Sequence, residues 1–143
     1  MLMGQYSHNL DEKGRIIIPA KHREKLSNVV VITKGFDGCI SLYSKENWEK
    51  FQNSLLALSL NVKDARKHVR VLVGSANEVE FDKQGRVLIS KDLIEKGFLK
   101  KECVVVGVLD HIEIWAKEVW DEYYLEASNE LEEVAEKLNE REK

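Results

Sequence analysis

The stretch DEKGRIII, residues 11–18, returns later in the chain as DKQGRVLI, residues 82–89. Both copies share the frame D-x-x-G-R, and branched apolar residues follow the arginine in each. An Asp that begins a turn can accept a hydrogen bond from the backbone two residues on, and a Gly can take the positive φ of a tight loop. Each copy therefore predicts the tip of a β-hairpin, with Arg15 or Arg86 as the first residue of the returning strand.

The repeat extends well beyond the two turns. The strand-like stretches VVVIT (residues 29–33) and VVVGV (104–108) follow the first and second turns. ISLYSKENW (40–48) then aligns with IEIWAKEVW (112–120). We interpret the chain as a tandem duplication in which each unit has the order strand, turn, strand, short helix, strand, turn, strand, long helix.

Two short and two long helices are expected. The short ones are Ala20–Leu26, preceded by Pro19, and Lys91–Lys96, ended by Gly97. The first long helix is Lys45–Leu58, with Trp48, Phe51, Leu55 and Leu58 on one face. The second begins at Lys117, and its apolar stripe contains Trp120, Tyr124, Ala127, Leu131, Val134 and Leu138. No third unit covers this stripe, so we expect the last helix to dock on a neighbouring subunit.

The two units are expected to share one core. Isolated hairpins of such short strands are marginal in water, so the apolar faces must be buried against each other. This predicts an α+β fold with pseudo-twofold symmetry. The expected boundaries are a first unit at 1–58, a connector at 59–76, a second unit at 77–120 and a C-terminal acidic helix at 121–143.

The net charge of −3 conceals an uneven distribution. Residues 1–117 hold 19 Lys and Arg against 15 Asp and Glu, whereas residues 118–143 hold 3 against 10. A mildly basic body is compatible with nucleic-acid binding.

No apolar run approaches the roughly 20 residues of a membrane span, and the N-terminus lacks the pattern of a signal peptide. No membrane partner is expected.

The chemistry-bearing residue types show no catalytic or metal-binding spacing. Cys39 and Cys103 lie beside strand-like apolar residues and are interpreted as buried small hydrophobes. The histidines, at positions 8, 22, 68 and 111, form no zinc motif. Asp11 and Asp82 could suggest two-carboxylate catalysis, but an arginine four positions after each would hold it ionised. We expect no enzyme activity, metal, cofactor or small-molecule substrate.

Turn geometry accounts for the Asp and Gly of each copy but does not require the arginine. Arg15 and Arg86, with Lys13 or Lys83 beside them, are either exposed turn residues or two side chains that enter a groove of DNA. The basic residues Lys63, Arg66, Lys67 and Arg70 leave a similar choice between a solvated helix face and phosphate contact.

Three stretches resemble the MraZ family of bacterial proteins, in the SpoVT/AbrB-like superfamily. They are GQYSHNLDEKGRIIIPAKHRE (4–24), FDKQGRVLIS (81–90) and IEIW (112–115), and the paired D-x-x-x-R motifs are typical of that family. The resemblance covers nearly the whole chain. It implies two tandem AbrB-like swapped-hairpin units that form a pseudo-twofold β-barrel with flanking helices. It also implies a cytoplasmic, nucleoid-associated transcription regulator that acts on the promoter of the division and cell-wall gene cluster and assembles into rings.

Carried over by motif position, the expected DNA-contact residues are Asp11, Lys13, Arg15, Asp82, Lys83 and Arg86. Ser90 departs from the first unit, which has Pro19 there, but lies outside the motif. Head-to-tail ring contacts would present the turns in one orientation, which predicts direct repeats in double-stranded DNA. A ring-forming scaffold without specific DNA readout is the alternative. Activation or repression, the operator sequence and the subunit number stay open.

Overall fold

The computed structural model describes residues 1–142 and has the mixed α and β content that the sequence predicts. The first half contains β1 (Gln5–Asn9), β2 (Arg15–Ile17), α1 (Ala20–Arg23), β3 (Val29–Lys34), β4 (Ile40–Ser44) and α2 (Lys45–Leu56). The second half begins with an extra helix, α3 (Lys63–Gly74), and continues with β5 (Asn77–Glu80), β6 (Arg86–Leu88), α4 (Lys91–Lys96), β7 (Glu102–Val108), β8 (His111–Ala116), α5 (Lys117–Asn129) and α6 (Leu131–Glu142). Apart from α3 and α6, the two halves have the same order of elements.

Serine caps explain the beginnings of two helices. Ser44 Oγ accepts a hydrogen bond from the backbone N–H of Asn47 at 3.1 Å, and Ser90 Oγ accepts one from Leu93 at 3.3 Å. Pro19, the counterpart of Ser90, precedes α1 and provides no side-chain cap. Capping satisfies a free N–H group of the first turn. Ser90, which replaces the proline of the first unit, therefore gives α4 a side-chain cap that α1 lacks.

The strands of the two units are exchanged. β1 pairs with β7 of the second unit, β5 pairs with β3 of the first, and every strand pair is antiparallel. The larger sheet has the order β1-β7-β8-β4-β3-β5, and β2 pairs with β6 as a separate two-stranded ribbon. The expected turns are present, but the two strands flanking each turn do not form the expected hairpin ladder with each other. β2 and β6 have only three residues each. By pairing with each other across the two units, they bury their middle residues in a common core.

The common core is built from both halves. Its fully buried side chains come from β2 and β6, from the residues just after them, and from the central strands of the sheet: Ile16, Ile18, Val87, Ile89, Ile32, Ile40, Leu42, Val105, Ile112 and Ile114, each at most 2% exposed. Burial of this apolar surface is the main favourable contribution to folding. Because Ile16 and Val87 come directly after the turn arginines, the core anchors both turns.

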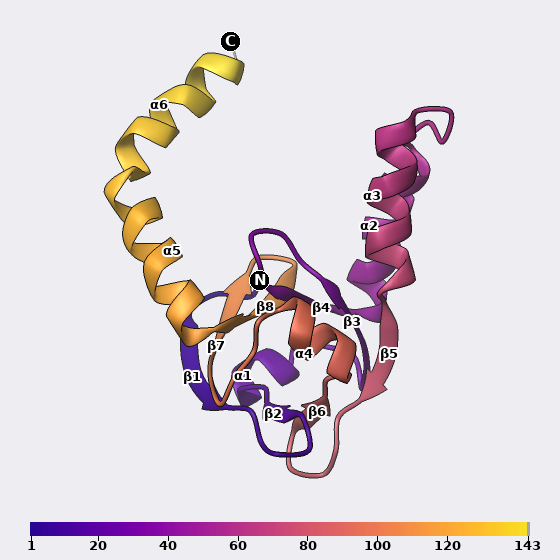
Figure 1. Ribbon diagram of the computed structural model, residues 1–143, viewed down its shortest axis with the longest axis vertical. Coiled ribbons are helices and arrows are strands. Elements are labelled where there is room, and N and C mark those ends of the chain that lie inside the picture. Colours follow the sequence, from indigo (N-terminus) through magenta and orange to yellow (C-terminus); the bar gives the residue numbers. More distant parts are fainter. Residues whose placement is uncertain (143) are drawn as a thin grey trace.

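The two long helices differ from the expected ones in length and in burial. α2 ends at Leu56, two residues early, and Leu58 is 40% exposed. The last helical segment is divided at Glu130 into α5 and α6, which extend away from the body (Figure 1). Trp120 is buried and donates from Nε1 to Gln5 Oε1 at 2.9 Å. The rest of the apolar stripe is exposed, including Tyr124 (50%) and Leu131 (68%).

Both cysteines are buried, as the sequence predicts, and are free thiols. Burial raises the pKa of Cys103 to about 11. Burial also raises the pKa of Cys39, and the nearby carboxylates of Glu113 and Asp37 act in the same direction. Thiols with raised pKa values are poor nucleophiles and poor metal ligands at neutral pH, so packing explains both cysteines.

His111 links two carboxylates at the turn between β7 and β8. Its Nδ1 lies 2.7 Å from Asp110 Oδ1, its Nε2 lies 3.2 Å from Glu113 Oε2, and its ring stacks on Tyr43. Burial alone would lower the pKa of His111, but hydrogen bonds to Glu113 and Asp110 outweigh it and raise this pKa above the ordinary 6.5. The protonated ring can donate to both carboxylates at once.

We expect this ion-paired histidine to make stability depend on pH. Because its folded-state pKa is raised, its contribution is complete below pH 6.5 and is lost as the pH rises through the folded value. His111→Gln removes the charge, so the difference in Tm between the two proteins should be largest near about pH 5.5 and shrink toward about pH 9. Thermal melting followed by circular dichroism measures this. A difference that stayed constant across that range would contradict it, and in a Glu113→Gln background the pH dependence should be weaker.

Candidate nucleic-acid interface

The two turns at residues 11–15 and 82–86, here called the arginine turns, have the same hydrogen-bond network. Asp11 Oδ1 accepts from the backbone N–H groups of Lys13 and Arg15, both at 2.9 Å. Asp82 Oδ1 accepts from those of Gln84 and Arg86, also at 2.9 Å. Each Asp thus satisfies backbone donors of its own loop, which is the structural role that the sequence predicts.

Glycine closes each arginine turn with a left-handed backbone. Gly14 has φ 85° and Gly85 has φ 78°, and each donates its N–H to the carbonyl of the turn's Asp at 3.0 Å. Both glycines are buried. A residue with a Cβ would be strained in this conformation.

Each arginine pairs with the Asp four positions before it, as the sequence analysis expected. Arg15 Nε donates to Asp11 Oδ2 at 2.8 Å, and Arg86 Nε donates to Asp82 Oδ2 at 2.7 Å. The second carboxylate oxygen of each Asp therefore binds the arginine, in addition to the roles of Asp and Gly that turn geometry predicts. The arginine side chains remain 31% and 24% exposed. Within residues 1–142, their terminal guanidinium nitrogens make no hydrogen bond shorter than 3.5 Å.

The ribbon brings the two arginine turns side by side at one end of the molecule (Figure 1). Ile18 N–H donates to Gly85 C=O at 3.1 Å, and Ile89 N–H donates to Gly14 C=O at 2.8 Å. Arg86 Nη1 also lies 3.8 Å from Asp11 Oδ2 of the other turn. All six predicted site residues therefore lie in one region, and Lys13 and Lys83 project from it as exposed side chains.

The turn carboxylates are held in their charged form. Backbone hydrogen bonds, first of all from Arg15 to Asp11 and from Arg86 to Asp82, lower the pKa of each carboxyl below its ordinary value, and the arginine side chains act in the same direction. A carboxylate that stays ionised and hydrogen-bonded is poorly suited to move protons. The two Asp carboxylates are therefore suited to orienting the turn backbone and the arginines, and not to transferring protons.

Sequence reasoning missed three residues beside the turns. Ile17 and Leu88 lie on the outer face of the ribbon and are 39% and 54% exposed. Arg23 of α1 donates to Ile18 C=O, and its guanidinium lies so close to Gly85 that a side chain there would collide with it. The signal for Ile17 and Leu88 was strand alternation, since each lies between two buried neighbours. Nothing in the sequence could identify the contact of Arg23.

The basic residues of α3 lie far from the arginine turns. In Figure 1 α2 and α3 extend from the end of the body opposite the turns, as α5 and α6 do. Arg66 donates to the carbonyls of Leu60 and Asn61 and so holds the loop before its own helix. Lys63, Lys67 and Arg70 are exposed.

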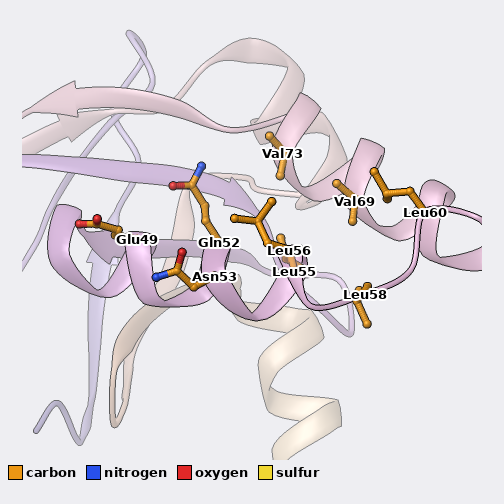
Figure 2. Close-up of a pocket in the computed structure, with 9 residues that line it drawn as sticks. All are labelled: Glu49, Gln52, Asn53, Leu55, Leu56, Leu58, Leu60, Val69 and Val73. Carbon is orange, nitrogen blue, oxygen red and sulfur yellow. The ribbon is translucent and has the colours of Figure 1, made fainter.

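A second surface feature is an apolar groove between α2 and α3. Its volume is about 430 Å³, and it is lined by Glu49, Gln52, Asn53, Leu55, Leu56, Leu58, Leu60, Val69 and Val73. Figure 2 shows Leu56 of α2 pointing toward Val69 and Val73 of α3. Leu56 is 80% exposed, which leaves a hydrophobic surface at the free ends of the two helices.

Among residues 1–142 no helix is long and apolar enough to span a membrane. In the same range, no three His, Cys, Asp or Glu side chains are grouped so that they could hold a metal ion. The most distinctive polar arrangement of the described chain is the pair of arginine turns.

Comparison with known proteins gives one consistent result. A family model described as "MraZ protein, putative antitoxin-like" matches the chain twice, over residues 1–71 and 72–142. The chain is 49% identical to the transcriptional regulator MraZ of Lactobacillus helveticus and 50% identical to that of Lactobacillus delbrueckii subsp. bulgaricus. It is 48% identical to that of Thermoanaerobacter sp., and each of these matches covers 97% of both chains. The chain therefore belongs to the MraZ family of transcriptional regulators and carries two tandem copies of its repeat.

Proposed function

We propose that this transcription regulator binds DNA sequence-specifically through its two arginine turns. The observation that carries the proposal is that two equal turns, each with an oriented arginine and an exposed lysine, lie side by side on one ribbon. On the family resemblance, we propose the promoter of the division and cell-wall gene cluster as the target. We also propose that the protein is cytoplasmic and associated with the nucleoid.

The six site residues have separable roles in this proposal. The major groove of B-DNA admits a two-stranded β-ribbon. Asp11 and Asp82 each bind the Nε of the arginine in their own turn, which leaves the terminal nitrogens of Arg15 and Arg86 without a hydrogen bond among residues 1–142. These nitrogens can donate to O6 and N7 of a guanine. Lys13 and Lys83 neutralise phosphates, which strengthens binding without reading sequence.

Arg15→Ala and Arg86→Ala should each weaken specific binding by roughly 5- to 150-fold, the equivalent of one bidentate guanine contact. Lys13→Ala should weaken binding to all sequences alike and reduce the salt slope by about one. Fluorescence anisotropy on selected and scrambled duplexes measures both effects.

The matched control for these substitutions is Lys50→Ala, which removes the same charge from α2, at the far end of the molecule and outside the α2–α3 groove. It should leave specific binding nearly unchanged. Both turn variants should keep the fold with at most a small decrease in Tm, because each Arg–Asp pair is partly solvent-exposed. Wild-type affinity in both turn variants would refute the readout role.

We further propose that the larger sheet and the ribbon close as a swapped-hairpin β-barrel. The edges of the six-stranded sheet are β1 and β5, and from each edge the chain passes through an arginine turn into the ribbon. The ribbon thus connects both edges. We retain the predicted division into units at 1–58 and 77–120, with the connector at 59–76 and the acidic helix at 121–143.

Two exposed apolar surfaces support assembly into a ring of identical chains. The apolar stripe of α5 and α6 is exposed, and the groove between α2 and α3 is open. α6 is rich in glutamate, whereas α3 exposes Lys63, Lys67 and Arg70. We propose that α6 of one chain packs in the α2–α3 groove of the next. Such a heterologous contact forms a ring when the rotation closes. Assembly alone would also serve a scaffold protein, which is the second candidate function.

Removal of residues 131–143 should reduce the mass of the assembly in light scattering. Trp120 stays in place in this shortened chain, so the body should keep its Tm. The triple variant Leu131→Ser, Val134→Ser and Leu138→Ser should have the same effect, and so should reversal of the α3 charges with Lys67→Glu and Arg70→Glu. An unchanged mass in all three would exclude this contact.

A ring with head-to-tail contacts should bind direct repeats in DNA. Its arginine turns face the same way around the edge, so equivalent boxes should be spaced near one helical turn, about 10–10.5 bp. Three boxes in phase should bind about 10²–10⁴-fold more tightly than one box, because linked sites raise the effective concentration. Three boxes shifted by half a turn are the control. Equal affinity for the two arrays would contradict the proposal, and loss of α6 should remove the preference.

A further inference from the structure

The outer face of the ribbon combines two arginines with two large aliphatic side chains. In its register Arg15 lies opposite Leu88 and Ile17 lies opposite Arg86, with Ile16 and Val87 between them. Ile16 and Val87 are buried, so strand alternation directs the other four side chains to the opposite face. Each arginine therefore has an aliphatic neighbour across the ribbon and another two residues along its own strand.

Ile17 and Leu88 present exposed apolar surface on this face of the ribbon. They are 39% and 54% exposed, although the neighbouring residues of each strand are buried or half-buried. Two guanidinium groups belong to the same small patch, and a two-stranded ribbon of this size fits the major groove of B-DNA.

We propose that Ile17 and Leu88 are specificity-determining residues that recognise the methyl groups of thymines beside the arginine-bound guanines. This inference rests on the proposed function, and it concerns residues outside the D-x-x-x-R motif. Aliphatic side chains make no hydrogen bonds, and the C5-methyl of thymine is the apolar feature that distinguishes base edges in the major groove. An apolar contact on this face therefore selects thymine.

The spacing of the ribbon sets the position of these thymines. Residues i and i+2 of a strand are separated by about 6.7 Å, and successive bases of one DNA strand rise about 3.4 Å. The arginine and the aliphatic residue of one strand therefore reach bases about two steps apart. Directly opposite side chains are closer, with Cβ atoms about 4.5–5.5 Å apart. Each thymine should thus lie within about two base pairs of a guanine that an arginine contacts.

The decisive comparison is between thymine and deoxyuridine, which differ only by this methyl. The full-length chain first selects duplexes from a random 30-bp library, and one selected duplex is then made with deoxyuridine at each thymine in turn. Wild-type protein should lose about fourfold in affinity at each contacted thymine, the effect of one buried methyl group. Ile17→Ala and Leu88→Ala should bind the thymine duplex more weakly, and each should no longer distinguish deoxyuridine at its own position.

Leu125→Ala is the matched control, because Leu125 is 66% exposed on α5, away from the arginine turns, and belongs neither to the α2–α3 groove nor to the apolar stripe. It should keep the full preference for thymine. The wild-type comparison needs no variant, so a folding defect in the alanine substitutions could not hide the result.

The outcomes separate this inference from the proposed function. If the library yields a preferred sequence that depends on Arg15 and Arg86 but tolerates deoxyuridine everywhere, the thymine contact is wrong and the arginine readout stands. The thymine contact is equally wrong if the selected sequence has no thymine within two base pairs of a required guanine, or if the ribbon inserts into the minor groove, where the methyl is absent. Failure to select any sequence would reject the proposed function itself.

Discussion

The pairing of β2 with β6 is the contact on which the rest of the molecule depends. It joins two three-residue strands from opposite halves of the chain, and backbone hydrogen bonds from Ile18 to Gly85 and from Ile89 to Gly14 extend it to the turns. One face of this ribbon delivers Ile16 and Val87 to the common core, and the other face carries Arg15 and Arg86. Stability and the proposed DNA contact thus use alternate residues of the same strands, so a shift of one residue would exchange core and surface.

Hydrogen bonds within each arginine turn order it in the absence of a binding partner. The Asp binds two backbone N–H groups with one carboxylate oxygen and the arginine Nε with the other, and glycine supplies the positive φ that closes the loop. A side chain that is already oriented loses less conformational freedom on binding, which is the usual advantage of preorganisation. The arginine is therefore part of the turn through Nε, and the proposed DNA contact uses its terminal nitrogens, so the two roles do not compete.

The pseudo-twofold symmetry is not complete at this surface. The guanidinium of Arg23 packs over Gly85, whereas Ile94 approaches the equivalent Gly14. The second arginine turn therefore has an additional positive charge nearby that the first lacks. The glutamates of α6 and the basic residues of α3 both lie at the end opposite the turns. The proposed contact between copies thus uses complementary charges at one end, and the proposed DNA contact lies at the other.

The sequence by itself determined the duplication, the kinds of elements and the residues of the arginine turns, because these follow from local rules. Asp and Gly specify a turn within five residues, and branched apolar runs specify strands, so Asp11 and Gly85 could be assigned without coordinates. Only the tertiary structure decided which strands pair. A three-residue strand has no preference for its own neighbour, and shared burial of Ile16 and Val87 selects the partner from the other half. For the same reason the contact of Arg23 with Gly85 could not be derived from the sequence, because it joins residues of the two halves that meet only across the fold.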